Sequence, residues 1–555
     1  MLPRRAFLGH GFSAVAMGLL SRASHGAIWA PNLGGQVRVG NPIEPIDLST
    51  PPQLIGGLPF APRWFGDVFP QNRLPFHQCE SCEPPNEPDE FVDVAVVGGG
   101  LSGLASAWML RDAQPVVFDL RRRFGGNAMG ESWEGVPYSM GSAYFIVPDR
   151  GSSLEALYRE LGVLADARID KGPLAFEWNH RITEDPCIGG CTPAERDAAR
   201  AYQRRVWYFA YDKYPDIPVP PRDLAWISSL DQVPLRDDIQ AACGALPVAL
   251  AEAVQAYCYS SFGVGWDQIS AAAGWNFIAA EEFGRVVLPG GNSSLASRLW
   301  SKLADRERSG QEPRLRPGAM VESVHVEDDR VLVRWRTAQG VRRTLSAKHV
   351  IMANAKHLVE RMVDDLATLD PDKANAIPLV QTAAYLVANV LLRRPADVDL
   401  YDTFLLHDAG FPMDPTAAER ERRIVDVVDG TFTRPSNARD VLTLYWPLPF
   451  ASARFTIVQD TDWQTYAELG APQIRRALGD LGISTQDVAE IRLTRWGHAM
   501  PIAAPGAIAN GTAELVRRPI AEKLWFVNQD NWLLPAVETC LLEAETYTAE
   551  IARRL

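Results

Sequence analysis

The sequence lacks any apolar run long enough to cross a bilayer, which takes about 20 residues, because its weakly apolar stretch Gly9–Leu20 is too short. It also has no internal repeat. Positive charge is scarce: 55 Lys and Arg residues face 68 Asp and Glu residues, so the formal net charge is −13. This balance argues against a nucleic-acid partner and against stable membrane insertion or binding to anionic membranes. The composition, 47% hydrophobic and 22% charged, is otherwise typical of a globular protein, and 555 residues suit more than one domain.

A glycine motif between two apolar runs is the strongest signal in the chain. The mostly β-branched run Val92–Val97 meets Gly98, Gly100 and Gly103, and small residues typical of a helix follow. A second apolar run ends on Asp119, about 20 residues after the first glycine. In this order of strand, turn, helix and strand, the glycines allow a pyrophosphate to approach the backbone, and the carboxylate accepts hydrogen bonds from ribose hydroxyls. The motif therefore predicts a dinucleotide site.

The residues after Asp119 indicate which dinucleotide binds. They are Leu120, Arg121, Arg122, Arg123, Phe124, Gly125, Gly126 and Asn127. An acidic strand end, a later Arg and a Gly-Gly pair resemble the second fingerprint of FAD enzymes in the flavin amine oxidase and phytoene desaturase superfamily, where they wrap the FAD pyrophosphate. The sequence departs from that pattern with Asp119 in place of Glu and Asn127 in place of a frequent Arg. The carboxylate argues against the 2′-phosphate of NADP, and the resemblance favours FAD over NAD.

The resemblance extends from about Val92 to the C-terminus and implies the fold class. We expect an α/β protein in which a Rossmann-like FAD-binding domain, a parallel sheet with helices, is interleaved with an α+β substrate domain. The expected divisions are a signal peptide (1–30), a Pro-rich arm (31–90), the FAD-binding domain (91–142, 286–376 and 495–555) and the substrate domain (143–285 and 377–494). In the substrate domain Ser153–Leu161, Pro193–Ala210 and Leu246–Phe262 are helix-like, Pro378–Leu392 fits a helix or a strand, and Asp440–Pro449 and Phe455–Gln459 are strand-like.

The resemblance also implies cofactor contacts outside the two fingerprints. The residue that matches Val321 contacts adenine through its backbone, and Asp530 matches an acidic residue that binds the ribityl chain. Val537 begins a helix whose N-terminus points at the flavin and stabilises negative charge there. Glu538 is expected to cap this helix, and the alternative is that it binds a substrate ammonium. The full set of expected FAD contacts is Gly98, Gly100, Leu101, Ser102, Gly103, Asp119, Leu120, Arg123, Gly125, Gly126, Asn127, Val321, Asp530 and Val537.

Four residues are candidates for the chemistry. A flavin enzyme holds a substrate C–H bond against the flavin ring. Trp496, Trp532 and Tyr445 are candidates for the aromatic cage that amine oxidases build over that ring, and the alternative for each is an ordinary core position. His498, in the segment expected to return to the active site, is a candidate proton acceptor, or else a structural histidine. No metal site is expected.

Lysine is missing where relatives use it. Many amine oxidases carry a lysine that hydrogen-bonds a water at the reactive flavin nitrogen, but this chain has no Lys between Lys373 and Lys523. The absence argues against fast reaction with dioxygen. We therefore expect a dehydrogenase with another electron acceptor, such as a redox partner, or a desaturase-like activity.

The N-terminus indicates export. Arg4-Arg5 is followed by Ala6-Phe7-Leu8 and a short apolar stretch, the pattern of a twin-arginine signal, which is removed from the mature protein. FAD is inserted in the cytoplasm, and the twin-arginine translocase carries folded proteins. We therefore expect an exported, periplasmic enzyme; the alternative is the basic tail of a cytoplasmic protein.

The Pro-rich segment is too apolar for a simple linker, and we expect it to form an extended arm over the folded body. It ends near Cys79 and Cys82, and Cys187 and Cys191 form a second close pair. In an oxidising compartment such pairs form structural disulfides, within or between pairs. Zinc binding and free thiols are the alternatives.

Three functions are compatible with the sequence. The first is an exported FAD-dependent oxidation of a small amine or amino acid. The second is a desaturase or oxidase of an apolar or tetrapyrrole-like substrate. The third is a flavin-binding partner protein whose FAD is structural.

Overall fold

The computed structural model describes residues 39–67, 87–172, 174–307, 312–396, 398, 400–406, 423–433, 438–449 and 456–555. The twin-arginine pattern and the first cysteine pair, Cys79 and Cys82, lie outside the described residues. None of the helices that the structure describes is long and apolar enough to cross a membrane.

A parallel sheet with helices forms the Rossmann-like domain. Its strands, in spatial order, are β13 (Leu315–Pro317), β5 (Val116–Asp119), β4 (Glu90–Val97), β16 (Arg342–Met352) and β22 (Leu524–Phe526). Side chains of β4 alternate between two cores: Val94 and Val96 enter one, and Ala95 and Val97 enter the other. Both faces of the sheet therefore need cover, as is usual for parallel strands.

Helices cover one face and a short antiparallel meander covers the other. The helices are α2 (Leu101–Met109), α9 (Asn292–Ala304) and α17 (Val537–Ala552), and they contribute Leu104, Leu295 and Leu541 to the core around Val94. On the opposite face β14 (Met320–Val326) and β15 (Val331–Arg336) continue from the first half of β16.

The substrate domain is built on a larger mixed sheet. In the described part of the chain its order is β11 (Arg181–Thr183), β10 (Ala175–Trp178), β18 (Asp402–Leu405), β19 (Asp426–Asp429), β20 (Asp440–Pro447), β17 (Thr382–Leu392), β21 (Val488–Pro501), β3 (Leu58–Gly66) and β2 (Gln53–Ile55). Leu386 and Ala388 of β17 face helix α15 (Asp462–Asp480), whereas Tyr385 and Val387 face the opposite side. Most of the ambiguous run at 378–392 is thus a strand, since β17 covers Thr382–Leu392, and its first residues belong to the 3₁₀ turn Ile377–Leu379. The expectation of a strand at Phe455–Gln459 is wrong for its described residues, 456–459, which form a single helical residue and turns.

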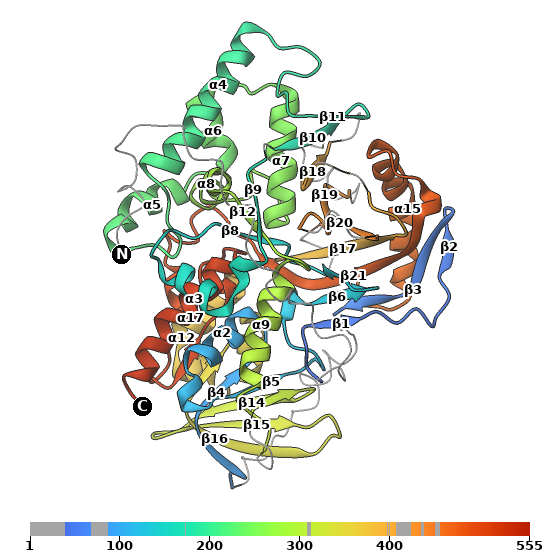
Figure 1. Ribbon diagram of the computed structural model, residues 1–555. Coiled ribbons are helices and arrows are strands. Elements are labelled where there is room, and N and C mark those ends of the chain that lie inside the picture. Colours follow the sequence, from blue (N-terminus) through green and yellow to red (C-terminus); the bar gives the residue numbers. More distant parts are fainter. Residues whose placement is uncertain are drawn as a thin grey trace, which may run out of the picture.

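Helices and two small sheets complete the fold. The small sheets are β1 (Ile43–Pro45), β6 (Gly130–Trp133) and β7 (Val136–Ser139), and β8 (Tyr144–Ile146), β12 (Arg285–Val287) and β9 (Arg168–Asp170). The remaining helices are α3 (Ser153–Leu161), α4 (Pro193–Trp207), α5 (Leu224–Asp231), α6 (Leu235–Cys243), α7 (Val248–Phe262), α8 (Ala271–Ala280), α10 (Lys356–Met362), α11 (Leu366–Leu369), α12 (Pro371–Ala376) and α16 (Thr512–Arg517). Figure 1 shows the α4–α8 region at the top, the parallel sheet with β4 at the bottom, and α15 beside the mixed sheet at the right. The three predicted helices of the substrate domain are confirmed as α3, α4 and α7, to within a few residues at their ends.

The described part of the N-terminal arm is a structural part of both domains. Strand β1 pairs with β6, and the β2–β3 hairpin extends the mixed sheet because β3 pairs in parallel with β21. Asp67, just after β3, forms an ion pair with Arg121 and accepts a hydrogen bond from the Gly497 N–H at 2.8 Å. The segment therefore does more than lie over the folded body.

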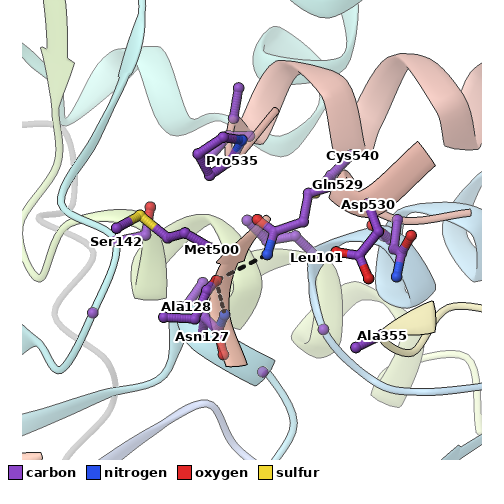
Figure 2. A pocket seen from close by; sticks show the side chains of 18 of the residues that line it. Leu101, Asn127, Ala128, Ser142, Ala355, Met500, Gln529, Asp530, Pro535 and Cys540 are labelled. Carbon is purple, nitrogen blue, oxygen red and sulfur yellow. Dashed lines mark hydrogen bonds between the residues drawn. The ribbon is translucent and has the colours of Figure 1, made fainter. Parts of the chain in front are cut away.

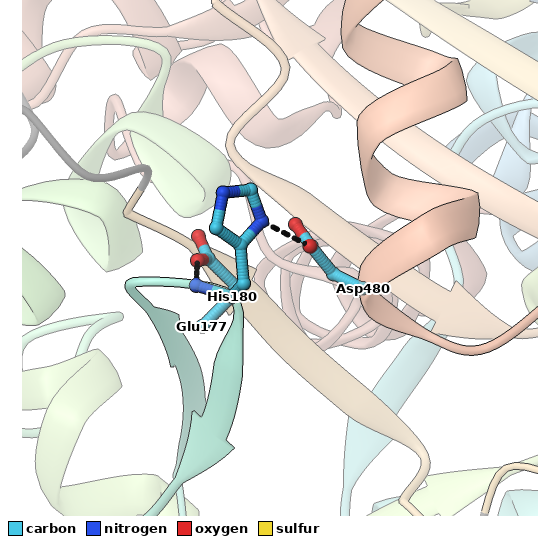
Figure 3. Close-up of side chains that lie close together, drawn as sticks. All are labelled: Glu177, His180 and Asp480. Atoms are coloured by element: carbon cyan, nitrogen blue, oxygen red, sulfur yellow. Dashed lines mark hydrogen bonds and ion pairs between the residues drawn. The ribbon is translucent and has the colours of Figure 1, made fainter.

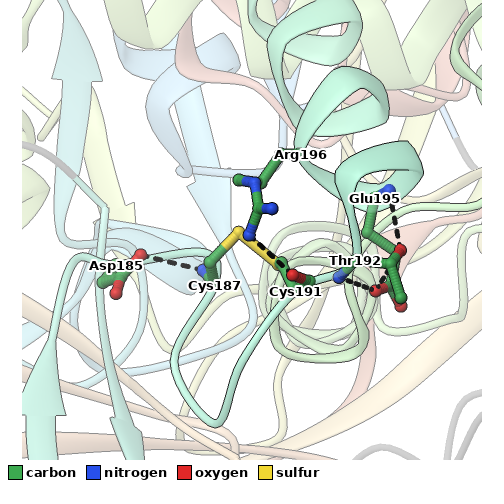
Figure 4. The surroundings of a disulfide bond; sticks show 6 residues. All are labelled: Asp185, Cys187, Cys191, Thr192, Glu195 and Arg196. Atoms are coloured by element: carbon green, nitrogen blue, oxygen red, sulfur yellow. Dashed lines mark hydrogen bonds between the residues drawn. A yellow bond between two sulfur atoms is a disulfide. The ribbon is translucent and has the colours of Figure 1, made fainter.

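A disulfide joins Cys187 to Cys191 on the loop before α4, with 5.2 Å between their Cα atoms. The Cys187 N–H donates to Asp185, and the Arg196 guanidinium donates to the Cys191 carbonyl (Figure 4). Among the expected chemistries for this pair, a disulfide within the pair is the one the structure contains.

Candidate functional site

One cavity of about 740 Å³ joins the two domains. It begins at the carboxyl edge of the parallel sheet, where Gly98 follows β4 and Asp119 ends β5, and reaches the mixed sheet at Tyr385 and Tyr445. The carboxyl edge of a parallel sheet is the usual place for ligands in this class of fold. Figure 2 shows side chains from both domains around the central part of the cavity, including Asn127, Met500, Gln529 and Asp530.

The three motif glycines have different physical roles. A Cβ on Gly103 would lie 1.9 Å from the Gly98 carbonyl oxygen, and a Cβ on Gly98, whose φ is +111°, would lie 2.9 Å from the backbone of Ala353. Both glycines are therefore needed for close packing of strand and helix. At Gly100 the nearest atom to an added Cβ is the Gly126 Cα at 3.8 Å, an ordinary contact. The protein leaves this space open, as a pyrophosphate site requires.

Helix α2 presents its N-terminus to the same space. Its N-cap is Gly100, which provides no side-chain cap, and Leu101 and Ser102 in its first turn line the cavity. The first N–H groups of a helix have no partner within the helix and attract anions. The arrangement suits a diphosphate.

Asp119 is positioned to bind a ribose. Its carboxylate accepts hydrogen bonds from the Gly99 N–H at 2.8 Å and from the Arg121 N–H at 2.7 Å. Burial raises the pKa of Asp119, and the Arg121 charge and the two N–H donors oppose that effect. The side chain is thus held at the strand end and lines the cavity.

The second fingerprint packs against the first, with one difference from expectation. The Gly125 N–H donates to the Gly99 carbonyl at 2.8 Å, and Leu120, Gly125, Gly126 and Asn127 all line the cavity. Arg123 does not: its guanidinium donates to the Gly130 carbonyl at 2.9 Å and lies 3.7 Å from Glu44. Arg121 lines the cavity instead, 5.5 Å from the centre of the Trp496 ring.

Of the first fingerprint, Gly103 does not line the cavity, whereas three expected cofactor contacts outside the two fingerprints do. They are Val321, Asp530 and Val537. The Asp530 carboxylate accepts a hydrogen bond from the Lys356 N–H at 2.8 Å, and burial raises its pKa. Helix α17 starts at Val537 without a side-chain cap, so the expectation that Glu538 caps it is wrong; that carboxylate accepts a hydrogen bond from the Ile146 N–H at 2.7 Å.

Sequence reasoning did not anticipate a role for Lys356 near Asp530. Its side chain is fully buried and donates to Asn528 at 2.7 Å and to Asn531 at 2.5 Å. Burial lowers the pKa of Lys356 to about 8, and Asp530 opposes this shift. In the sequence, this position is marked only by a basic residue directly after the mostly apolar run Val350–Ala355.

Three of the four candidate catalytic side chains lie at the cavity. The Tyr445 hydroxyl donates to the Gly141 carbonyl at 2.7 Å, and the Trp496 indole donates to the Met140 carbonyl at 2.9 Å. His498 lies 2.8 Å from the Thr382 hydroxyl through Nδ1 and stacks on His357, with 3.6 Å between ring centres. These residues are available to orient a substrate.

Trp532 is placed elsewhere. Its indole N–H donates to Glu543 at 2.8 Å, the Arg517 guanidinium lies 4.5 Å from its ring centre, and it is not among the residues that line the cavity. Trp532 is therefore an ordinary core residue, which was the alternative to a place in the aromatic cage.

The sequence did not predict a cluster of buried carboxyls at the substrate end of the cavity. This cluster, here called the acidic wall, consists of Asp170, Asp402 and Asp426. Arg285 lies between Asp170, at 2.8 Å, and Asp402, at 2.9 Å, and Asp426 is the next carboxyl along the wall. Asp402 and Asp426 both line the cavity. The available signal was an Asp inside each of the runs Tyr401–Leu406 and Ile424–Val428, because a carboxylate in a buried strand is costly unless it is paired or has a function.

Another pair of carboxyls, Asp429 on β19 and Asp440 on β20, lies away from the cavity. Burial and the nearby Asp440 raise the pKa of Asp429 to about 7, and the Thr431 hydroxyl lies within hydrogen-bonding distance of both carboxyls. Neither carboxyl belongs to the cavity lining. A substitution at Asp429 can therefore serve as a control for substitutions in the acidic wall.

The Asp429 pair predicts a pH-dependent stability. The folded protein keeps a proton on Asp429 up to about pH 7, whereas an unfolded Asp loses it near pH 4, so the free energy of unfolding should fall by roughly 2–4 kcal/mol between these pH values. Asp429→Asn should abolish this part of the pH dependence, because an amide does not titrate. Urea midpoints measured across this range test the expectation, and an equally steep loss of stability in the variant would contradict it.

Three side chains at the edge of the substrate domain are close enough together to resemble a metal site. Glu177, His180 and Asp480 offer ligand atoms within 4.8 Å of one another (Figure 3). However, Arg476 lies 3.4 Å from Glu177 and 3.5 Å from Asp480, and His180 Nδ1 is 2.7 Å from Asp480. The guanidinium already balances the carboxylates, so the cluster is explained as an ion-pair network between β10, the following turn and α15.

The chain is similar in sequence to known proteins. The family model described as an NAD(P)-binding Rossmann-like domain matches residues 96–161. The chain is 22% identical over 513 residues to the protein named oxidoreductase PigB of Serratia sp. (strain ATCC 39006), a match that covers 82% of this chain and 74% of that protein.

Solved structures extend the comparison to the fold. Cyclohexylamine oxidase from Brevibacterium oxydans IH-35A superposes with a TM-score of 0.60 at 15% identity, covering 83% of this chain and 99% of that one. Putrescine oxidase bound to putrescine superposes with a TM-score of 0.56 at 17% identity, covering 84% and 99%. The expected fold class is confirmed: the chain has the α/β architecture of these amine oxidases, with a Rossmann-like domain joined to a substrate domain.

Proposed function

We propose that this chain is an FAD-dependent oxidoreductase that oxidises an amine. The observation that carries the proposal is the single cavity that connects the glycine loop of the Rossmann-like domain to a buried acidic wall. A dinucleotide at one end and negative charge at the other suit a redox cofactor and a basic substrate, since amines are protonated at neutral pH and are attracted to carboxylates. The amine oxidases that share the fold support the same reaction class.

The residues at the glycine loop fit FAD. Gly100 leaves room for a diphosphate, the start of α2 offers unpaired N–H groups, and Asp119 can accept hydrogen bonds from a ribose. The Oδ1 atom of Asn354, a cavity-lining residue, is buried and has no hydrogen-bond partner in the described part of the chain, as expected of a polar group that a ligand satisfies. When bound, the flavin would supply the electron acceptor for a substrate C–H bond.

The chain itself would orient the substrate and handle its protons. Tyr385 and Tyr445 meet edge to face with 6.0 Å between ring centres, and Trp496 lies near them on β21. Such fixed rings restrict how a substrate can lie in the cavity. His498, held by Thr382, is the side chain of this group that can accept a proton from an amine.

The electron acceptor is proposed to be a redox partner in place of dioxygen. No lysine occurs among the residues that line the cavity in the described part of the chain. In the amine oxidases that the chain resembles, a lysine at the flavin is the feature expected to accompany fast reaction with dioxygen. Lys356, the nearby buried lysine, directs its ammonium group at Asn528 and Asn531.

A second candidate function is oxidation of an apolar substrate. Ile217, Phe277 and Phe404 line the substrate end and give it a large apolar surface. This lining favours a desaturase-like reaction on a hydrocarbon or tetrapyrrole-like molecule. The acidic wall, which such a substrate would leave uncompensated, is the reason to prefer an amine.

One spectroscopic experiment separates these functions. The purified protein should show the two absorption bands of oxidised flavin, and anaerobic addition of amines should bleach them. A protein that stays colourless after reconstitution with FAD contradicts the cofactor. A yellow protein bleached by apolar substrates alone supports the second function, and one bleached by no substrate class supports a structural flavin.

Export through the twin-arginine translocase to the periplasm is also part of the proposal. The Arg4-Arg5 pattern supports it, and so does the Cys187–Cys191 disulfide, since disulfides persist in oxidising compartments. Replacing both arginines by lysine should retain the protein in the cytoplasm. Normal export of that variant would contradict the route.

A further inference from the structure

Asp402 and Asp426 form a carboxyl pair on one face of the mixed sheet. Strands β18 and β19 are antiparallel, and their register places Phe404 opposite Asp426 and Val428 opposite Asp402. The two carboxyls are therefore diagonal neighbours, a relation in which side chains on adjacent strands meet. Only 5% of Asp402 and 3% of Asp426 is exposed, and both residues line the cavity.

Each carboxyl has one satisfied oxygen and one unsatisfied oxygen. The Oδ2 atom of Asp402 receives the Arg285 guanidinium at 2.9 Å, and the Oδ2 atom of Asp426 receives the Ser260 hydroxyl at 2.8 Å. Both Oδ1 atoms are buried and have no hydrogen-bond donor among the described residues. An unpaired buried oxygen costs about 1–3 kcal/mol, so two of them side by side require an explanation.

A single proton shared by the two carboxyls satisfies both oxygens. The Arg285 guanidinium pairs with Asp402, so the shared proton is placed on Asp426. Burial, followed by the proximity of Asp402, raises the pKa of Asp426 well above its usual range. In a free cavity the pair thus holds one proton and one negative charge.

Neighbouring charged groups keep this wall negative. Those that face the pair from other elements are Arg285, Asp170, Glu281, Tyr144, Tyr385, Tyr401 and Tyr445. Burial holds the pKa of all four tyrosines well above its usual value, so they remain neutral. Burial also raises the pKa of Glu281. Arg285 is one cation placed between the two carboxyls of Asp170 and Asp402.

We propose that the Asp402–Asp426 pair is a binding subsite for a second, non-reacting ammonium group of a diamine substrate. The inference rests on the proposed amine oxidation. The incoming ammonium replaces the shared proton and donates N–H bonds to the two Oδ1 atoms, while the displaced proton passes to solvent. A nitrogen whose adjacent C–H bond is oxidised must be neutral, because its lone pair stabilises the cation that forms. The ammonium held at the wall is therefore a different nitrogen of the same substrate.

The surroundings of the pair suit an organic cation. Tyr445 lies directly opposite Asp426 in the neighbouring strand, and Phe404 shares the same face. Aromatic rings beside carboxylates favour alkylammonium groups, which combine charge with apolar surface. A neutral hydroxyl could not displace the shared proton, since it brings no charge to replace it.

Asp426→Asn tests the proposal because its amide imitates the protonated carboxyl permanently. The amide N–H₂ can donate to Asp402 as the shared proton does, so the fold should be retained, but the donor cannot leave. Putrescine and butylamine, which differ in the second amino group, are the paired probes. The ratio of putrescine to butylamine affinity, measured by anaerobic flavin bleaching, should fall at least ~10-fold in Asp426→Asn.

Proton release provides a readout that does not depend on turnover. Calorimetry of the holoenzyme with its flavin already reduced, in two buffers of different ionisation enthalpy, should show that the wild type releases about one proton more per putrescine bound near neutral pH than Asp426→Asn does. A proton lost by the reacting amine is common to both proteins. Asp429→Asn, on the same strand but away from the cavity, should leave both the affinity ratio and proton release unchanged.

The outcomes distinguish this inference from the proposed function. If no amine bleaches the flavin, amine oxidation itself fails. If putrescine and butylamine bleach it with the same affinity ratio in wild type and Asp426→Asn, amine oxidation stands and the diamine subsite is wrong. Equal proton release on putrescine binding by the wild type and by Asp426→Asn would also overturn the subsite.

Discussion

Gly100→Val should yield a folded protein that no longer holds FAD. The substituted Cβ meets no protein atom closer than 3.8 Å, and the backbone of Gly100, with φ −74°, is accessible to any residue. The valine side chain instead fills the space above the start of α2. We expect FAD affinity to fall by about 100-fold or more, equivalent to ~2.7 kcal/mol, with thermal stability of the FAD-free protein close to that of the wild type.

Gly103→Ala is the contrasting variant. Its Cβ would lie 1.9 Å from the Gly98 carbonyl oxygen, so the helix and strand must separate. This variant should lose stability with or without FAD. Flavin content and melting temperature of both variants, measured after reconstitution, test the assignment. Full flavin binding by Gly100→Val would place the cofactor elsewhere, and equal destabilisation of the two FAD-free variants would show that Gly100 is needed for packing.

Local patterns predicted the backbone elements at the glycine end of the cavity. The order of strand, glycine turn and helix at 92–110 depends on residues close in sequence, and the structure reproduces it as β4 and α2. The hairpin of β14 and β15 is equally local, because a short turn joins its two strands. Where contacts are local, the sequence contains the information needed to place them.

The placement of Arg123 was not predictable from its spacing alone. The chain leaves β5 in a bend, and which arginine faces the cavity depends on how that bend meets the arm. Arg121 is drawn toward Asp67, a residue more than fifty positions away. Arg123 points instead to the Gly130 carbonyl. The resemblance supplied the residue type, and a non-local ion pair determined which residue lines the cavity.

The acidic wall depends entirely on non-local register. Asp402 and Asp426 become neighbours only because β18 and β19 pair with Phe404 opposite Asp426. Arg285 arrives from a different sheet. A one-residue shift in pairing would turn one carboxyl to the opposite face. Nothing in the linear sequence fixes that register. The apolar neighbours of each Asp indicate that it is buried, but they do not predict that the two carboxyls lie side by side.

Arg492→Met should strongly destabilise the substrate domain. Arg492, on β21, binds both oxygens of Glu131 at 2.9 and 3.0 Å and donates to Glu490 at 2.7 Å. Its guanidinium also lies 3.8 Å from the centre of the Phe65 ring in the arm. Arg492 is 2% exposed, and the two carboxylates are also buried. The methionine would leave two buried negative charges without a cation, which costs about 3–5 kcal/mol.

The pH dependence of this loss identifies its electrostatic origin. Burial already raises the pKa of Glu490, and Arg492 opposes that shift. Without the guanidinium the carboxyls of the folded variant should hold protons to higher pH than in the unfolded chain. Stability of the variant is then lost as pH rises, so its deficit relative to wild type should be larger at about pH 8 than at about pH 5.

Arg492→Lys separates charge from shape. Lysine keeps a cation beside Glu131 and Glu490 but cannot bind Glu131 through two parallel N–H bonds. Its deficit should therefore be smaller than that of Arg492→Met and nearly independent of pH. Urea midpoints of the three proteins at both pH values provide the measurement. A deficit below about 1 kcal/mol in Arg492→Met, the value typical of exposed pairs, would mean that solvent compensates the carboxylates and that the arm is not anchored by this network.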